Sequence, residues 1–133
     1  MVEQQLDDFM AEEGYVKVPS NLPEFIFYYY LEKNYVNVFH VIYYEKNLYI
    51  TEEQYQHIKD KIRAFFKEKK VDDVHIMSLI VSRDTEKGKR ICKEDPFCWM
   101  IDPSNDRLVV YENQVGDFYG MRNKIERFLA QTS

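Results

Sequence analysis

The sequence predicts an α/β (α+β) fold: a single mixed β-sheet with two β-hairpins, flanked by helices in the order α-β-β-β-α-β-α-β-β-α. Apolar residues recur at intervals of three and four after Thr51, which indicates an amphipathic helix. Two segments rich in aromatic and β-branched residues precede it, and the turn residues 32–34 between them predict a hairpin. A near-continuous apolar run, Val74–Val81, follows the helix and indicates a strand buried on both faces. A strand, a helix and a strand in succession predict a crossover unit.

The first two elements are a short acidic helix and a short strand. The helix is predicted over residues 2–13 because Leu6, Phe9 and Met10 fall at helical spacing. Gly14 lies where a glycine commonly ends a helix. Residues 15–18 then predict a strand.

The first hairpin joins strands at residues 25–31 and 35–44. The second of these strands carries apolar residues on both faces: Val36, Val38, Ile42 and Tyr44 on one, and Phe39, Val41 and Tyr43 on the other. A strand with two apolar faces is expected near the centre of the sheet, covered on both sides.

The helix after Thr51 begins with the pattern of a capping box, in which Gln54 reaches back to the N-cap residue. Its buried stripe is predicted to consist of Tyr55, Ile58, Ile62, Phe65 and Phe66. Its other face is predicted to be solvated and carries Lys59, Asp60, Arg63 and Lys67.

The C-terminal part predicts a helix, a second hairpin and a final helix. The first helix covers residues 84–93 and begins at Asp84, a residue that can cap it. Strands at 97–101 and 108–111 flank the turn-forming residues 102–106. Asp117 can cap the last helix, whose apolar stripe contains Met121, Ile125, Phe128 and Leu129.

The composition predicts one folded domain that spans residues 1–133. The chain is 45% hydrophobic, and its 11 Tyr, nine Phe and one Trp exceed what a core of this size requires. We therefore expect some aromatic residues to form a contact surface. The alternative is that tyrosines simply line half-buried strands.

Charge and cysteine content exclude several classes of protein. The net charge of −5 repels phosphate backbones, so no nucleic-acid partner is expected. Two cysteines, Cys92 and Cys98, provide neither a disulfide framework nor a four-cysteine zinc site. No leader pattern and no run of 18 apolar residues is present, so we expect a cytoplasmic segment that does not insert into lipid.

No complete catalytic motif is present, so we expect a chain that is not an enzyme and needs no cofactor. Its four glycines lack the spacing of nucleotide-binding loops, and no serine follows a Gly-x pair. His40, His57 and His75 form no metal-binding pair. Cys98 has no adjacent base, which indicates a buried, inert thiol rather than a nucleophile.

Two weak constellations could hold a divalent cation, although we assign no metal ligand. Residues 72–73, both Asp, precede His75 at a junction of helix and strand, and the alternative there is a solvated loop. Asp102 and Glu112 lie where nucleases of the restriction-endonuclease type place two carboxylates, but Gln114 occupies the position of the lysine. A degenerate metal-dependent nuclease-like domain is therefore the least favoured alternative.

Three segments near the C-terminus together carry a family resemblance: residues 95–102 (DPFCWMID), 107–114 (RLVVYENQ) and 117–120 (DFYG). Residues 35–38 and 74–79 extend it more loosely upstream, so it covers most of the chain. In these segments the chain resembles the cytosolic N-terminal domain that precedes the membrane part of certain bacterial rhomboid family intramembrane serine proteases.

The resemblance implies that the full-length protein continues past Ser133 into transmembrane helices that hold a Gly-x-Ser-Gly nucleophile and a partner histidine. Neither motif occurs in residues 1–133, so no catalytic residue is assigned here. The implied role is regulatory: a domain on the cytoplasmic side of the membrane, covalently attached to the membrane protease, that recruits a substrate or protein partner. The alternative is a free-standing protein-interaction module.

The expected contact surface combines four aromatic residues and one amide: Phe97, Trp99, Gln114, Phe118 and Tyr119. Aromatic anchors supply most of the binding energy of protein interfaces, which favours this cluster. The alternative is that the four aromatic residues belong to the core.

Overall fold

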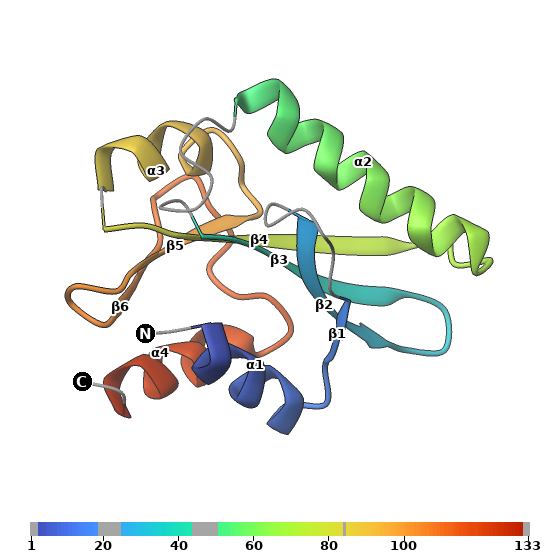
Figure 1. The fold of residues 1–133 in the computed structure, drawn as a ribbon, viewed down its shortest axis with the longest axis horizontal. Helices are drawn as coiled ribbons and strands as arrows, with labels where there is room; N and C mark the ends of the chain where they lie inside the picture. The colour runs from blue at the N-terminus through green and yellow to red at the C-terminus, as the bar shows by residue number, and fades with distance from the viewer. Residues whose placement is uncertain (1–2, 19–24, 44–50, 84, 132–133) are drawn as a thin grey trace.

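The computed structural model of the chain describes residues 3–18, 25–43, 51–83 and 85–131. In these residues the chain forms a six-stranded mixed sheet, in the order β1-β2-β3-β4-β5-β6, and four helices. Helices α2 and α3 cover one face of the sheet, and α1 and α4 cover the other (Figure 1). The order of elements is the predicted one, so the predicted fold class is confirmed.

The N-terminal part of the sheet is an antiparallel meander. Helix α1 spans Glu3–Glu12, and Gly14 follows it with a φ of 86°, a left-handed conformation that glycine adopts readily. Strands β1 (Val16–Val18), β2 (Ile26–Leu31) and β3 (Val36–Tyr43) pair in sequence. Every residue of β3 is buried, as predicted for a covered strand. Tyr44 lies outside the described residues.

Helix α2 (Glu52–Glu68) forms the first crossover connection, between β3 and β4 (Val74–Val81). The predicted capping box is present: the Thr51 hydroxyl accepts a hydrogen bond from the Gln54 amide at 3.1 Å, and Gln54 Oε1 accepts one from the Thr51 amide at 2.8 Å. β4 then pairs with β3 in parallel along its whole length.

The C-terminal part adds a second crossover and a hairpin: α3 (Thr85–Cys92), β5 (Cys98–Asp102), β6 (Arg107–Val109) and α4 (Met121–Gln131). β5 is parallel to β4, and β6 is antiparallel to β5. The predicted cap of α4 is confirmed, because the Asp117 carboxylate accepts hydrogen bonds from the amides of Gly120 at 2.9 Å and Arg122 at 3.1 Å. Asp84, the predicted cap of α3, lies outside the described residues.

Successive residues of each strand point to opposite faces of the sheet, so their buried side chains form two apolar layers. The layer under α1 and α4 includes Leu6, Phe39, Trp99 and Ile125. The layer under α2 includes Phe27, Val38, Ile62, Phe66 and Ile76. Both faces of the sheet are therefore covered. The strand side chains that are available for contact with another molecule are those at the ends of the sheet.

One prediction about α2 is wrong. Lys59 was expected on the solvated face, but only 6% of its surface is exposed. It forms an ion pair with Asp95, which lies between α3 and β5. A buried lysine requires an acidic partner, and a partner 36 positions away in sequence is invisible to helical periodicity.

Candidate functional site

The expected contact residues divide into a buried group and an exposed group. Trp99, Phe118 and Gln114 are 0%, 5% and 8% exposed, so their side chains belong to the core and not to a contact surface. Phe97 and Tyr119 are each 47% exposed. The core alternative therefore holds for Trp99 and Phe118: Trp99 lies in β5, all of whose residues are buried, and the Phe118 ring packs against Phe39 at 5.2 Å.

The buried polar groups of Trp99 and Gln114 hold the segment that leads to α4. The indole N–H of Trp99 donates to the carbonyl of Val115 at 3.0 Å. The Gln114 amide donates to the carbonyl of Cys92 at 2.6 Å and accepts a hydrogen bond from the Tyr111 amide at 2.8 Å. Gln114 is thus a structural residue, since its amide joins this segment to the end of α3.

Tyr119 stacks on two rings from the start of β3 and β4. The rings of Tyr35 and His75 are stacked with centroids 5.1 Å apart, and the Tyr119 ring lies 5.7 Å from Tyr35 and 5.6 Å from His75. A hydrogen bond joins the Tyr119 hydroxyl to His75 Nδ1, and Asp73 lies 2.8 Å from His75 Nε2. The three stacked rings form a shelf, which we call the aromatic shelf.

Phe97 faces the aromatic shelf across a groove of about 470 Å³. Eight residues line this groove: Arg63, Val74, His75, Ile76, Phe97, Asp117, Phe118 and Tyr119. The carboxylate of Asp117 is already engaged in capping α4. Although burial raises the pKa of this carboxyl, the amides of Arg122, Phe118 and Gly120 outweigh that effect, so its pKa lies below the ordinary value.

The described residues with large, exposed apolar side chains gather at the end of the sheet where β3, β4 and β5 begin. They are Val16, Tyr30, Leu31, Phe97 and Tyr119. The strand registers bring Val16 and Leu31 to this end, since β1 begins and β2 ends beside the start of β3. Phe97 and Tyr119 line the groove, whereas Val16, Tyr30 and Leu31 lie outside it on β1 and β2. Exposed apolar side chains grouped at a groove are typical of interaction surfaces, whereas scattered ones are not.

The buried ion pair between Lys59 and Asp95 holds the backbone segment that carries Phe97. Lys59 Nζ pairs with Asp95 Oδ2, the Tyr55 hydroxyl donates to the same oxygen at 2.7 Å, and the Phe97 amide donates to Oδ1 at 2.9 Å. Burial raises the pKa of the Asp95 carboxyl, but the hydrogen bonds from Lys59 and Tyr55 lower it more, so the net pKa is lowered. Asp95 therefore stays ionised and fixes the backbone that carries Phe97.

Sequence reasoning missed His75 and Arg63 as groove residues and Tyr35 as a ring of the aromatic shelf. Tyr35 directly precedes β3 and His75 is the second residue of β4. Because parallel neighbouring strands begin at the same end of a sheet, the predicted crossover between these strands was a signal that could have placed the two rings together. Arg63 carried no comparable signal.

The residues weighed as metal ligands serve as turn and surface groups. Asp102 is buried, and its carboxylate accepts hydrogen bonds from the Ser104 amide at 3.0 Å and the Asn105 side chain at 2.8 Å. Glu112 is exposed and follows the end of β6. In the described part of the chain no three His, Cys, Asp or Glu side chains are grouped to hold a metal ion.

Both cysteines are buried free thiols, as expected for Cys98. Burial, with the neighbouring Cys92 thiol as the next cause, raises the pKa of Cys98 well above its ordinary value. A thiol held in its protonated form is a poor nucleophile, so the geometry gives Cys98 a packing role.

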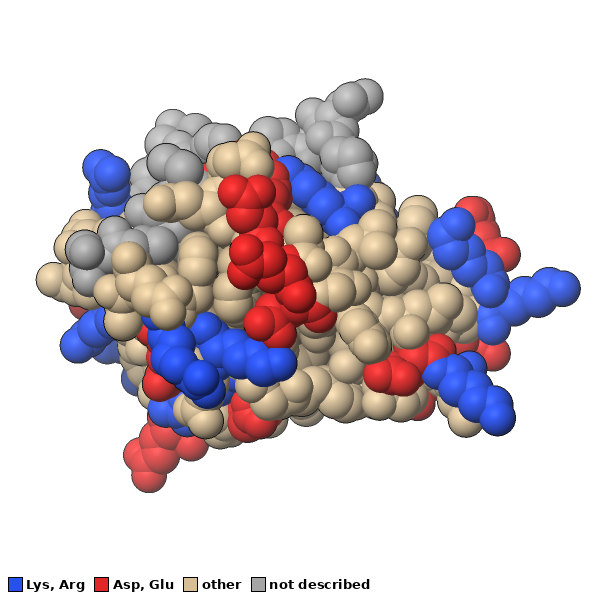
Figure 2. Space-filling model, turned by 90° about the horizontal axis from the view of Figure 1, so that it is seen from below, with Lys and Arg blue, Asp and Glu red and all other residues tan. Residues whose placement is uncertain are grey.

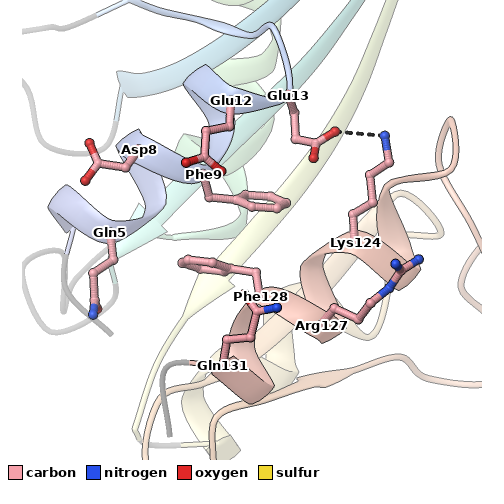
Figure 3. Close-up of a pocket in the computed structure, with 9 residues that line it drawn as sticks. All are labelled: Gln5, Asp8, Phe9, Glu12, Glu13, Lys124, Arg127, Phe128 and Gln131. Atoms are coloured by element: carbon pink, nitrogen blue, oxygen red, sulfur yellow. Dashed lines mark hydrogen bonds and ion pairs between the residues drawn. The ribbon is translucent and has the colours of Figure 1, made fainter.

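A second groove, of about 510 Å³, lies between α1 and α4 (Figure 3). Acidic side chains form a stripe on this face, with lysine and arginine side chains beside it (Figure 2). The rings of Phe9 and Phe128 stack at 4.7 Å, and Lys124 bridges to Glu13 at 2.8 Å across the groove. These two contacts join the helices, so we assign this groove a structural role.

No helix in the described part of the chain has both the length and the apolar character needed to cross a membrane. The chain matches no protein-family model, no curated protein and no solved structure. The geometry of the groove is therefore the main basis for a functional conclusion.

Proposed function

We propose that this chain is a non-catalytic cytosolic domain of a rhomboid-type intramembrane serine protease, and that it binds a substrate or protein partner in the groove between Phe97 and the aromatic shelf. In this proposal the full-length protein is a serine endopeptidase in the membrane. The covalently attached domain lies on the cytoplasmic side and regulates the protease by recruitment.

One observation carries the proposal. Two of the three segments that carry the sequence resemblance, residues 95–102 and 117–120, and the two that extend it upstream, residues 35–38 and 74–79, each contribute a ring to one site. They supply Phe97, Tyr119, Tyr35 and His75, respectively. Segments far apart in sequence thus meet at a groove lined by two exposed aromatic side chains, Phe97 and Tyr119, which is typical of a binding site and not of a core.

The chemistry of the groove supports binding in preference to catalysis. Among the described residues that line the groove there is no serine, threonine or cysteine that could act as a nucleophile. Both ring nitrogens of His75 already lie within hydrogen-bonding distance of Asp73 and Tyr119. A general base needs a free nitrogen facing its substrate, whereas an aromatic surface suits the anchoring of an apolar side chain.

The gene sequence downstream of the codon for Ser133 tests the membrane attachment. We expect several apolar segments of about 20 residues, one of which contains Gly-x-Ser-Gly. A stop codon directly after Ser133 would contradict the attachment and favour the free-standing interaction module.

Cleavage assays on the full-length protease test the role of the groove. Phe97→Ala combined with Tyr119→Ala is expected to lower kcat/KM for a recruited protein substrate by about 30-fold or more, because each of the two lost anchors costs about 1–2 kcal/mol. Cleavage of a short peptide that contains only the scissile region is expected to remain unchanged. The matched control is Val16→Ala, an exposed apolar residue outside the groove, and equal loss in this control would contradict the assignment.

A further inference from the structure

The groove contains an unpaired stretch of strand β4. β3 pairs with β4 from Val74 to Val81, whereas β5 pairs with it only from Ser78 to Val81. Among the described strands none lies beside Val74–Met77 on the β5 side. β4 therefore has about four residues without a described strand partner on its β5 side, and three of them, Val74, His75 and Ile76, line the groove.

The backbone polar groups of Ile76 point toward this unpaired side of β4. The Ser78 amide donates to the carbonyl of Phe97 on the β5 side at 2.9 Å, and the Asp73 carbonyl accepts from the Val36 amide on the β3 side at 3.0 Å. Backbone groups alternate between the two sides along a strand. Ile76 therefore directs its N–H and C=O to the same side as Ser78, into the groove.

The two walls of the groove differ in chemistry. Phe118 and Tyr119 form the wall on the α4 face, whereas Arg63 on α2 forms the wall on the opposite face. The Arg63 side chain is 53% exposed, and its Nη1 lies 3.7 Å from Asp60 Oδ1, which is long for an ion pair. Phe97 closes the end of the groove where β5 begins.

An extended peptide is complementary to both the unpaired side of β4 and the walls. Successive side chains of a strand point to opposite faces, so one residue meets the aromatic wall and the next meets Arg63. An apolar residue followed by an acidic residue matches this arrangement. Main-chain hydrogen bonds to a sheet edge supply affinity in this mode of recognition, and side-chain pockets supply specificity.

We infer that the groove binds an extended peptide that pairs with Val74–Met77 in line with β5, with apolar side chains on Tyr119 and acidic side chains toward Arg63. This inference rests on the proposed function, since it specifies the partner class for the same groove. The partner is a protein segment without regular structure of its own, which is ordered by strand addition.

The probe is a capped heptapeptide of alternating valine and glutamate, titrated to millimolar concentration into the ¹⁵N-labelled 133-residue chain. We expect saturable amide shifts at Val74–Met77. Hydrogen exchange of the Ile76 amide is expected to slow about tenfold at about 90% saturation, because only the free fraction exchanges. The matched control peptide has a central proline, which cannot donate to the edge, and is expected to give no protection of Ile76.

Charge reversal separates specificity from pairing. Arg63→Glu is expected to weaken binding of the valine–glutamate peptide about threefold, because an exposed ion pair contributes little more than this. The same variant is expected to bind a heptapeptide of alternating valine and lysine more tightly than the valine–glutamate peptide. Binding without protection of Ile76 would overturn strand addition and leave the groove as a contact surface. If no peptide shifts any groove residue while Phe97→Ala with Tyr119→Ala still impairs cleavage of the recruited substrate, the extended-peptide inference is wrong and the proposed function stands. If that pair of substitutions has no effect on cleavage, the proposed function fails by its own test.

Discussion

The buried ion pair between Lys59 and Asp95 provides the most direct test of the structure. The side chains of Lys59 and Asp95 are 7% and 11% exposed, so removal of one leaves a buried charge without its partner. Loss of one member of a buried pair costs about 3–5 kcal/mol. For Lys59→Met we expect about 3 kcal/mol, the lower end, because Asp95 keeps the hydrogen bonds from the Tyr55 hydroxyl and the Phe97 amide.

Asp95→Asn is expected to destabilise the fold by a similar amount, since the ammonium group then lacks a carboxylate. The double variant Lys59→Met with Asp95→Asn is expected to cost about 2 kcal/mol less than the sum of the two single variants, which is the coupling expected of residues in contact. Urea unfolding measured through the fluorescence of Trp99, the one tryptophan of the chain, gives these free energies.

The matched control is Asp60→Asn, an acid on the same helix whose side chain is 75% exposed. Its effect is expected to stay within about 0.5 kcal/mol. If Lys59→Met lies within 1 kcal/mol of the wild type, or if the single variants add without coupling, the reasoning from burial is refuted.

The same pair has a pH signature. The pKa of Asp95 is lower in the folded state than its ordinary value, so the pair stabilises the fold fully above the unfolded pKa of about 4. This stability is lost as the pH falls through the folded pKa. Below pH 4 the difference in unfolding free energy between the wild type and Asp95→Asn is therefore expected to shrink, and a constant difference would contradict the assignment.

Three further changes test other parts of the fold. Gln114→Ala is expected to destabilise by about 2–3 kcal/mol in urea unfolding, because the Cys92 carbonyl and the Tyr111 amide lose their partner; a change under about 1 kcal/mol would contradict this. Lys70→Gly is expected to stabilise by about 1 kcal/mol, since Lys70 follows α2 with a φ of 64° and glycine adopts this conformation without strain; a loss of stability would be the contrary result. Finally, Cys98 is expected to resist a thiol reagent in the native state and to react on unfolding, and rapid native labelling at pH 8 would contradict its burial and raised pKa.

Much of the fold could be predicted because its determinants are local. The capping box at Thr51 and the cap at Asp117 each depend on residues within five positions, and both are present in the structure. The fully apolar pattern of β3 identified it as a covered strand, since a strand that is apolar on both faces must be buried on both. The bounds of β4 match the predicted run Val74–Val81.

The candidate site was only partly predictable. Phe97 and Tyr119 were identified by residue type, but residue type could not separate them from Trp99 and Phe118, which pack in the core. The distinction depends on where β5 begins, because Phe97 directly precedes the strand and Trp99 lies within it. Phe118 and Tyr119 both lie in the turn before α4, but the Phe118 ring packs against Phe39 in the core while Tyr119, with a φ of 54°, is exposed.

The elements, their order and the caps follow from local sequence, since periodicity and capping act over a few residues. Three features follow only from tertiary packing: the burial of Lys59, the meeting of four separated segments at the aromatic shelf and Phe97, and the lack of a described strand partner for Val74–Met77 on the β5 side. The physical reason is the range of the interactions. Strand register and buried ion pairs depend on partners tens of residues away, whose positions are set by packing of the whole sheet.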